Sequence, residues 1–284
     1  MQKTKWIFKA SRWLAAALFG MAVLAGCVSL EDKERQWIFQ PSKVAWGGGI
    51  SGIDGVQEVW IPFDSAVTGR GVRLNALWLP AASAKAPVLL YLHGARWDVS
   101  GSARRMERMR QLGFSVLGID YRGFGKSGDE LPSERMAYED AEAAWRYLAQ
   151  HCPTNQRFIF GHSLGAAVAV NLATEEPDAA GLILEGSFTS IADVFGTFKW
   201  GWLPVSGLIT QRFDAASKIG KIKVPLLVMH GSEDSLIPPA LGRALYDRAP
   251  EPKRFVLVDG GSHHNTNAVG QEQYRVALHE MYGL

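Results

Sequence analysis

The amino-acid sequence predicts an α/β fold, in which a mostly parallel sheet is covered by helices on both faces. Short apolar segments of strand length alternate with segments of helical pattern, which is typical of this class. Most of the strand-like segments are apolar at nearly every position, as in parallel strands buried on both faces. The chain has 284 residues, a normal length for one such domain, and no repeat at a period of roughly 20–50 residues indicates a solenoid or propeller.

Eight strands are predicted between residue 56 and the C-terminus. Segments 56–63 and 71–79 predict an antiparallel opening pair. Six buried strands are expected after it, at 88–93, 114–120, 157–161, 182–185, 224–230 and 254–259. The helical patterns between them cover 102–112, 133–151, 164–174, 239–248 and 271–281. In such a sheet, functional residues gather at the carboxyl ends of the strands.

The N-terminus has the pattern of a secretion signal. Four basic residues precede an apolar stretch at 13–23, which is too short to span a bilayer comfortably. The stretch leads into Leu24-Ala25-Gly26-Cys27, which resembles a bacterial lipobox. That resemblance implies cleavage before Cys27 and a lipoprotein anchored by acyl chains on this residue. Val28 in place of Asp favours, by the same resemblance, the outer membrane of a Gram-negative cell, facing the periplasm. An ordinary signal peptide and an uncleaved anchor are the alternatives.

Three regions follow from these patterns: a signal peptide at 1–26, a tether at 27–55 and a folded domain at 56–284. The signal segment carries four of the 30 basic residues and none of the 28 acidic residues, which leaves 26 basic residues against 28 acidic ones. The sequence therefore has no basic patch that would indicate nucleic-acid binding. With Cys27 acylated, Cys152 has no partner for an intramolecular disulfide. No cluster of His, Cys or carboxylate residues has the spacing of metal ligands, so the sequence predicts no metal site.

The strongest chemical motif is Gly161-His162-Ser163-Leu164-Gly165, which lies between a predicted strand and an Ala-rich helix. A Gly-x-Ser-x-Gly turn in this context is typical of a nucleophile elbow, whose strained turn lifts the serine hydroxyl out of the sheet. The helix N-terminus beneath it favours developing negative charge. Ser163 is therefore the predicted nucleophile, and a plain helix N-cap is the alternative.

A serine hydroxyl becomes a good nucleophile when a base removes its proton and a carboxylate orients that base. In this kind of fold the order along the chain is Ser, acid, His. Asp234 follows the predicted strand 224–230, and His263 follows the predicted strand 254–259. We therefore expect Asp234 to orient His263 as the base for Ser163.

Neighbouring residues leave alternatives for both partners. Gly261-Ser262-His263 has the usual spacing of the catalytic His, but His264 is followed by Asn265, which is also a common arrangement. His264 therefore stays open as the base. Glu233 and Glu185 stay open as the acid, because each lies close to the end of a predicted strand.

Two backbone N–H groups are needed to bind the oxyanion of a tetrahedral intermediate. We expect these donors at Leu164, after the nucleophile, and at Ala95, in the loop after strand 88–93. An apolar segment at about 186–214 is long enough for a short cap over the nucleophile. The aromatic residues expected to line a substrate pocket there or nearby are Trp97, Phe188, Trp200 and Trp202. The alternative is that the apolar side chains of this segment simply bury themselves.

Four motifs together resemble the α/β-hydrolase superfamily: Asp120-Tyr-Arg-Gly-Phe-Gly-Lys-Ser-Gly128, the Ser163 elbow, and segments 182–191 and 230–239. More narrowly, they are similar to the Bem46/ABHD13/ABHD17-like branch. The resemblance runs from about residue 56 to the C-terminus and implies the eight-stranded α/β-hydrolase fold with a short cap. The chain departs from the family pattern at His93-Gly94-Ala95-Arg96, where relatives carry His-Gly-Asn-Ala.

These residues predict a serine hydrolase that cleaves an ester, thioester or amide bond through an acyl-Ser163 intermediate, with no cofactor. The expected partners are a small-molecule or acyl substrate and, through the lipid on Cys27, a membrane. Two other functions stay open: a non-catalytic lipoprotein that uses the fold as a binding module, and an acyltransferase with the same triad.

Overall fold

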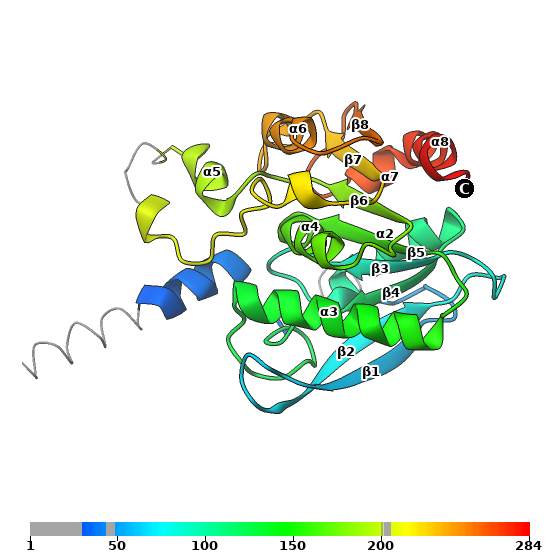
Figure 1. Cartoon of the computed structure of the whole chain (residues 1–284), viewed down its shortest axis with the longest axis horizontal. Helices are drawn as coiled ribbons and strands as arrows, with labels where there is room; N and C mark the ends of the chain where they lie inside the picture. Colours follow the sequence, from blue (N-terminus) through cyan, green and yellow to red (C-terminus); the bar gives the residue numbers. More distant parts are fainter. Residues whose placement is uncertain (1–29, 44–48, 200, 202–205) are drawn as a thin grey trace, which may run out of the picture.

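The computed structural model describes residues 30–43, 49–199, 201 and 206–284. An eight-stranded sheet forms its centre, with the strand order β1-β2-β4-β3-β5-β6-β7-β8. Strands β3 to β8 are mutually parallel, whereas β2 is antiparallel to both β1 and β4. Helices pack on both faces of the sheet (Figure 1). The predicted fold is therefore confirmed.

The predicted elements recur with shifts of a few residues at their ends. The strands are β1 (Gln57–Asp64), β2 (Gly71–Leu79), β3 (Val88–Leu92), β4 (Ser115–Ile119), β5 (Arg157–His162), β6 (Gly181–Glu185), β7 (Leu226–Gly231) and β8 (Lys253–Val258). The helices are α2 (Ala103–Gln111), α3 (Glu134–His151), α4 (Leu164–Glu175), α5 (Ile191–Gly196), α6 (Pro239–Asp247), α7 (Thr266–Val269) and α8 (Gln271–Tyr282), with short 3₁₀ turns at Val99–Ser102, Ser206–Leu208 and Ile219–Lys221.

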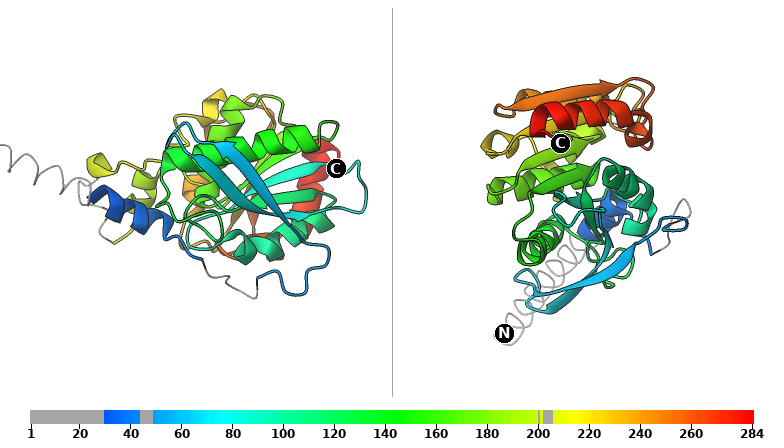
Figure 2. Two further views of the ribbon diagram at one scale, coloured as in Figure 1. Left: turned by 90° about the horizontal axis from the view of Figure 1, so that it is seen from below. Right: turned by 90° about the vertical axis from the view of Figure 1, so that its right-hand side faces the viewer.

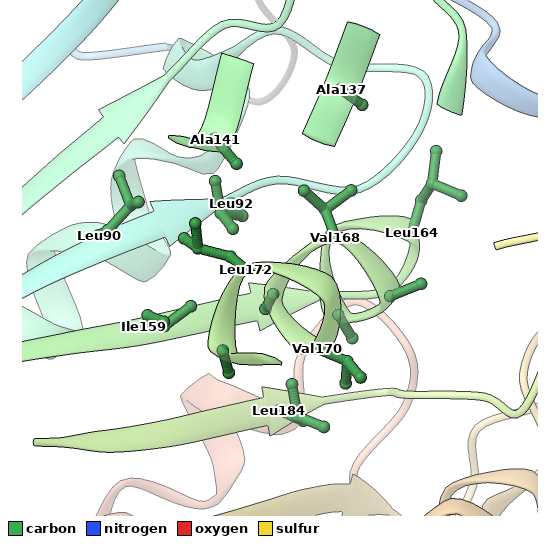
Figure 3. Packing of buried hydrophobic residues seen from close by; sticks show 14 of the residues in the cluster. Leu90, Leu92, Ala137, Ala141, Ile159, Leu164, Val168, Val170, Leu172 and Leu184 are labelled. Carbon is green, nitrogen blue, oxygen red and sulfur yellow. The ribbon is translucent and has the colours of Figure 1, made fainter. Parts of the chain in front are cut away.

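The sheet separates two hydrophobic cores. Side chains of a strand alternate between its two faces, so Leu90 and Leu92 of β3 join the core beneath α3 and α4, while Leu89 and Tyr91 join the core beneath α2 and α8. Figure 3 shows Leu90 and Leu92 packed beside residues of α3 and α4, and Figure 2 shows the helical layers around the sheet. Burial on both faces explains the continuous apolar runs that predicted parallel strands.

Residues 30–39 form a helix that packs on the domain, where the sequence predicts a tether. The Glu34 carboxylate accepts hydrogen bonds from the N–H groups of Thr210 (2.8 Å) and Gln211 (2.9 Å). Phe39 is fully buried, and its ring lies 5.6 Å from that of Phe213. The helix lies beside the cap segment in Figure 1. None of the helices in the described ranges combines the length and apolarity that crossing a bilayer requires.

Candidate active site

Ser163 lies in a sharp turn between β5 and α4. Its backbone has φ 55° and ψ −122°, a strained conformation for a residue other than glycine. A Cβ atom at Gly161 would lie 2.3 Å from the carbonyl oxygen of Gly165, and one at Gly165 would lie 2.1 Å from that of Leu92. Both flanking glycines are therefore required, because α4 starts in direct backbone contact with the neighbouring strand.

The structure brings Ser163, His263 and Asp234 together from three separate loops. His263 Nε2 lies 2.9 Å from Ser163 Oγ, and His263 Nδ1 lies 2.7 Å from Asp234 Oδ2. Both distances are those of good hydrogen bonds. A proton can therefore pass from the hydroxyl to the imidazole, while the carboxylate accepts the other ring N–H.

Asp234 is held as a carboxylate by its surroundings. Its Oδ1 accepts hydrogen bonds from the backbone N–H groups of Leu236 (3.0 Å) and Ile237 (2.8 Å). Burial opposes ionisation, but interactions with His230, His263 and the Ile237 N–H outweigh it and lower the pKa of Asp234. Asp234 therefore stays charged and keeps the Nδ1–H tautomer of His263.

The other residues that the sequence left open as acid or base lie outside the hydrogen-bonded path from Ser163 to Asp234. Glu233 is exposed. Glu185 is fully buried, and its Oε1 lies 2.7 Å from Arg105 Nε. The His264 ring packs against Trp97 with ring centroids 5.3 Å apart. In this arrangement only His263 contacts both Ser163 and a carboxylate among the described residues.

The loop after β3 lies directly against the nucleophile. A Cβ atom at Gly94 would approach Ser163 Cβ to 3.0 Å, so glycine allows this contact. Arg96 N–H donates to the Phe39 carbonyl (2.9 Å), which fixes the loop from the N-terminal helix. Ala95 N–H makes no hydrogen bond within the described residues. Leu164 begins α4, so its N–H has no acceptor inside the helix.

A small cavity of about 50 Å³ opens beside Ser163. Its lining includes Ala95, Trp97, Arg105, His162 and His264. Trp97 thus lies where the sequence placed it, whereas Phe188 is buried in the core next to α4. The cap residues Trp200 and Trp202 and the lipidation residue Cys27 lie outside the described residues.

Sequence reasoning missed Arg105 and His162 as parts of this site. His162 occupies the variable position of the elbow, and Arg105 lies on the buried side of α2 next to Met106. A buried arginine within an otherwise apolar helix face is the one local signal that could have indicated it.

His93, directly after β3, has a structural role. Its Nδ1–H donates to the Gly94 carbonyl (2.6 Å), and its ring packs on Tyr121 and Phe124. Burial lowers the pKa of His93 to about 4. The ring is therefore neutral at physiological pH and holds the loop after β3 as a fixed donor.

Sequence comparison identifies a matching family model and related proteins. The family model described as serine aminopeptidase, S33, matches residues 83–218 and 196–268. An uncharacterised protein of Mycobacterium tuberculosis is 33% identical over 90% of both chains. The lysophosphatidylserine lipase ABHD12 of Danio rerio is 34% identical over 59% of this chain and 48% of its own. Bem46 of Schizosaccharomyces pombe is 32% identical over 67% and 65%.

A solved structure, the esterase Pf2001 of Pyrococcus furiosus, has the same fold. It superimposes with a TM-score of 0.66 at 19% identity, covering 85% of this chain and 97% of the esterase. At this identity the likeness concerns the fold alone.

Proposed function

Because the chain belongs to the serine aminopeptidase S33 family of α/β-hydrolases, we propose that it is a serine hydrolase whose nucleophile is Ser163. The observation that carries this proposal is the continuous hydrogen-bonded path from Ser163 Oγ through His263 to Asp234. The confirmed resemblance to Bem46 and ABHD proteins places the chain in a hydrolase family.

In this mechanism, Ser163 Oγ attacks the substrate carbonyl carbon while His263 Nε2 takes the hydroxyl proton. The N–H groups of Ala95 and Leu164 bind the oxyanion of the tetrahedral intermediate. His263 then gives its proton to the leaving group, and an acyl-Ser163 ester remains. Water, activated by the same imidazole, releases the acid and restores Ser163. Asp234 holds the imidazole in the required tautomer throughout.

We propose a carboxylic ester as the substrate. The relative from Danio rerio is named as a lipase for lysophosphatidylserine, which is an ester substrate. The cavity beside Ser163 has room for only a small group, about 50 Å³. A larger acyl chain would therefore extend out of this cavity.

Fluorophosphonate labelling and a series of p-nitrophenyl esters of increasing acyl length test this function. We expect the parent protein to be labelled and to turn over at least one ester, and Ser163→Ala to do neither. Ser187→Ala is the matched control, because Ser187 is fully buried and its hydroxyl has no hydrogen-bond partner in the described structure. Labelling of Ser163→Ala at the parent level would exclude Ser163 as the nucleophile.

We also propose that a lipid on Cys27 anchors the protein at the membrane, with the outer membrane, facing the periplasm, favoured in a Gram-negative cell. Leu30, Glu34 and Trp37 recur at helical spacing, so they share one face of the N-terminal helix. Leu30 and Trp37 are exposed (69% and 52%), as is Leu208 (76%), which lies two residues before the Glu34 partner Thr210. Leu30 follows Cys27 by only three residues in the sequence, so these exposed apolar side chains support a membrane-facing orientation.

Fractionation and mass spectrometry test the anchor. The parent is expected in the detergent-extracted membrane fraction with an acylated N-terminal Cys27, and Cys27→Ser is expected to leave that fraction or to remain uncleaved. Cys152→Ser is the matched control, because this half-buried cysteine lies at the end of α3. A mature parent whose unmodified N-terminus is another residue would refute the anchor.

A further inference from the structure

A buried polar cluster lies beneath the loop that carries His263, and the mechanism above leaves it without a role. It consists of Arg105 from α2, His162 from the end of β5, Glu185 from the end of β6 and Tyr274 from α8. Glu185 and Tyr274 are fully buried, and His162 and Arg105 are only 5% and 7% exposed. Four separate elements therefore bring these polar side chains to one point.

The cluster ends on the main chain of the catalytic loop. Arg105 Nε lies 2.7 Å from Glu185 Oε1, and Glu185 Oε2 accepts a hydrogen bond from the Tyr274 hydroxyl. Arg105 Nη2 donates to the carbonyl oxygen of His264 at 3.2 Å. His162 Nε2 lies 3.0 Å from the His263 carbonyl. Two consecutive carbonyl groups of the loop are thus held from below.

The ionisation states of the two donors fit this arrangement. Burial opposes the charge of Arg105, but Glu185, Tyr91 and Tyr274 together outweigh burial and raise the Arg105 pKa, so the guanidinium stays charged. Burial, together with the nearby positive charge of Arg105, lowers the pKa of His162, so its ring is neutral. A carbonyl oxygen can only accept, so the single ring proton of His162 is on Nε2.

A buried ion pair is an expensive way to stabilise a fold. Apolar residues of similar volume often serve equally well or better, because both charges must leave water. The pair here, however, does what apolar residues cannot do, since Arg105 donates to a main-chain carbonyl next to the proposed base. Its arrangement is therefore better explained by geometry at His263 than by stability.

We propose that Arg105 and His162 are positioning residues that fix the main chain of His263 and His264, and that Glu185 and Tyr274 fix Arg105. This inference rests on the proposed function. The His263 ring must meet Ser163 and Asp234 at the same time, and errors of about 1 Å in such a site can lower rates by roughly 100-fold. Anchoring both adjacent carbonyls removes the freedom of the loop to shift or tilt the ring.

The decisive variant replaces the whole pair, Arg105→Met with Glu185→Leu, so that no charge remains buried alone. If the pair serves only the fold, this protein keeps the parent kcat per folded molecule, whatever happens to its melting temperature. We expect instead a similar melting temperature, an unchanged KM, and a kcat reduced roughly 10- to 100-fold. The acid limb of the kcat/KM pH profile is also expected to shift, because it reports His263 in the free enzyme.

The buried pair Arg122–Asp140 (2.8 Å) provides the matched control. Both residues are buried between α3 and the loop after β4, and they contact none of the triad residues. Arg122→Met with Asp140→Leu is expected to change the melting temperature but neither kcat per folded molecule nor the pH profile. A parent-like kcat and pH profile in the Arg105/Glu185 double variant would overturn the inference.

Arg105→Lys decides the question if the double variant does not fold. Lysine keeps the charge opposite Glu185 but has no planar fork to reach both Glu185 and the His264 carbonyl. We expect it to fold with kcat reduced about 10-fold, and parent-like kcat and pH dependence would overturn the inference. The proposed function is judged separately on the parent: a parent that labels and turns over supports it whatever the variants do, and a parent that does neither overturns both.

Discussion

Replacing Asp234 by Asn tests the proposed mechanism most directly, because the structure fixes how the new amide must lie. Asp234 Oδ1 accepts two backbone N–H groups, from Leu236 and Ile237. In the variant, the amide oxygen must keep this position, since an NH₂ group there would face two donors. The NH₂ group is therefore directed at His263 Nδ1, where Oδ2 lies 2.7 Å away in the parent.

That orientation forces the wrong tautomer of the base. A donor facing Nδ1 leaves the ring proton on Nε2, the atom 2.9 Å from Ser163 Oγ, so the base cannot accept the serine proton. The same exchange in a Ser-His-Asp protease lowers kcat by about 10⁴-fold, which corresponds to about 5 kcal/mol of transition-state stabilisation. We expect a loss of similar size here, with little change in the folded structure.

Steady-state rates on the best p-nitrophenyl ester measure this effect, and thermal melting checks the fold. Glu233→Gln is the matched control, because Glu233 is the adjacent carboxylate but is exposed and lies outside the triad. It is expected to keep kcat within a factor of about two. A folded Asp234→Asn protein with kcat within about 10-fold of the parent would refute the tautomer argument and the role given to Asp234.

Three other predictions follow from the same geometry. His263→Ala is expected to lower kcat by about 10³-fold or more and His264→Ala by about 10-fold, and initial rates on one activated ester would show the error if the ranking were reversed. Gly161→Ala would place a Cβ atom 2.3 Å from a backbone oxygen of α4; we expect a destabilisation of about 1–3 kcal/mol in urea unfolding, and an unchanged midpoint would contradict the packing argument. Burial lowers the pKa of His93 to about 4 from its ordinary 6.5, so the unfolded chain binds the extra proton between these pH values and stability falls by up to about 3 kcal/mol as the pH drops through them. Burial also raises the pKa of Asp120 to about 7, and this raised pKa acts on stability in the opposite sense. The His93 effect is therefore measured as the difference between the parent and His93→Asn in how the free energy of unfolding depends on pH. Identical pH slopes in the two proteins would count against it.

Local sequence patterns determined the order of the elements and the positions of the chemical groups along it. The apolar runs are set by burial on both sheet faces, and the Gly-x-Ser-x-Gly turn can be recognised from its neighbours in the chain. Ser163, Asp234 and His263 each follow a strand, and parallel strands end at one edge of the sheet. Their meeting there was therefore predictable, even though about 100 residues separate Ser163 from His263.

The tertiary structure alone decided what depends on side-chain direction and on contacts across the chain. Adjacent histidines leave the backbone in different directions, and only the fold shows that the His263 ring meets Ser163 while that of His264 meets Trp97. The sequence leaves Glu185 open as the acid. The structure shows that its carboxylate is paired with Arg105, 80 residues earlier in the chain. The N-terminal helix also escaped prediction, because Phe39 is buried against rings from distant loops. Periodicity records which positions are buried, but it does not record which distant residue shares that burial.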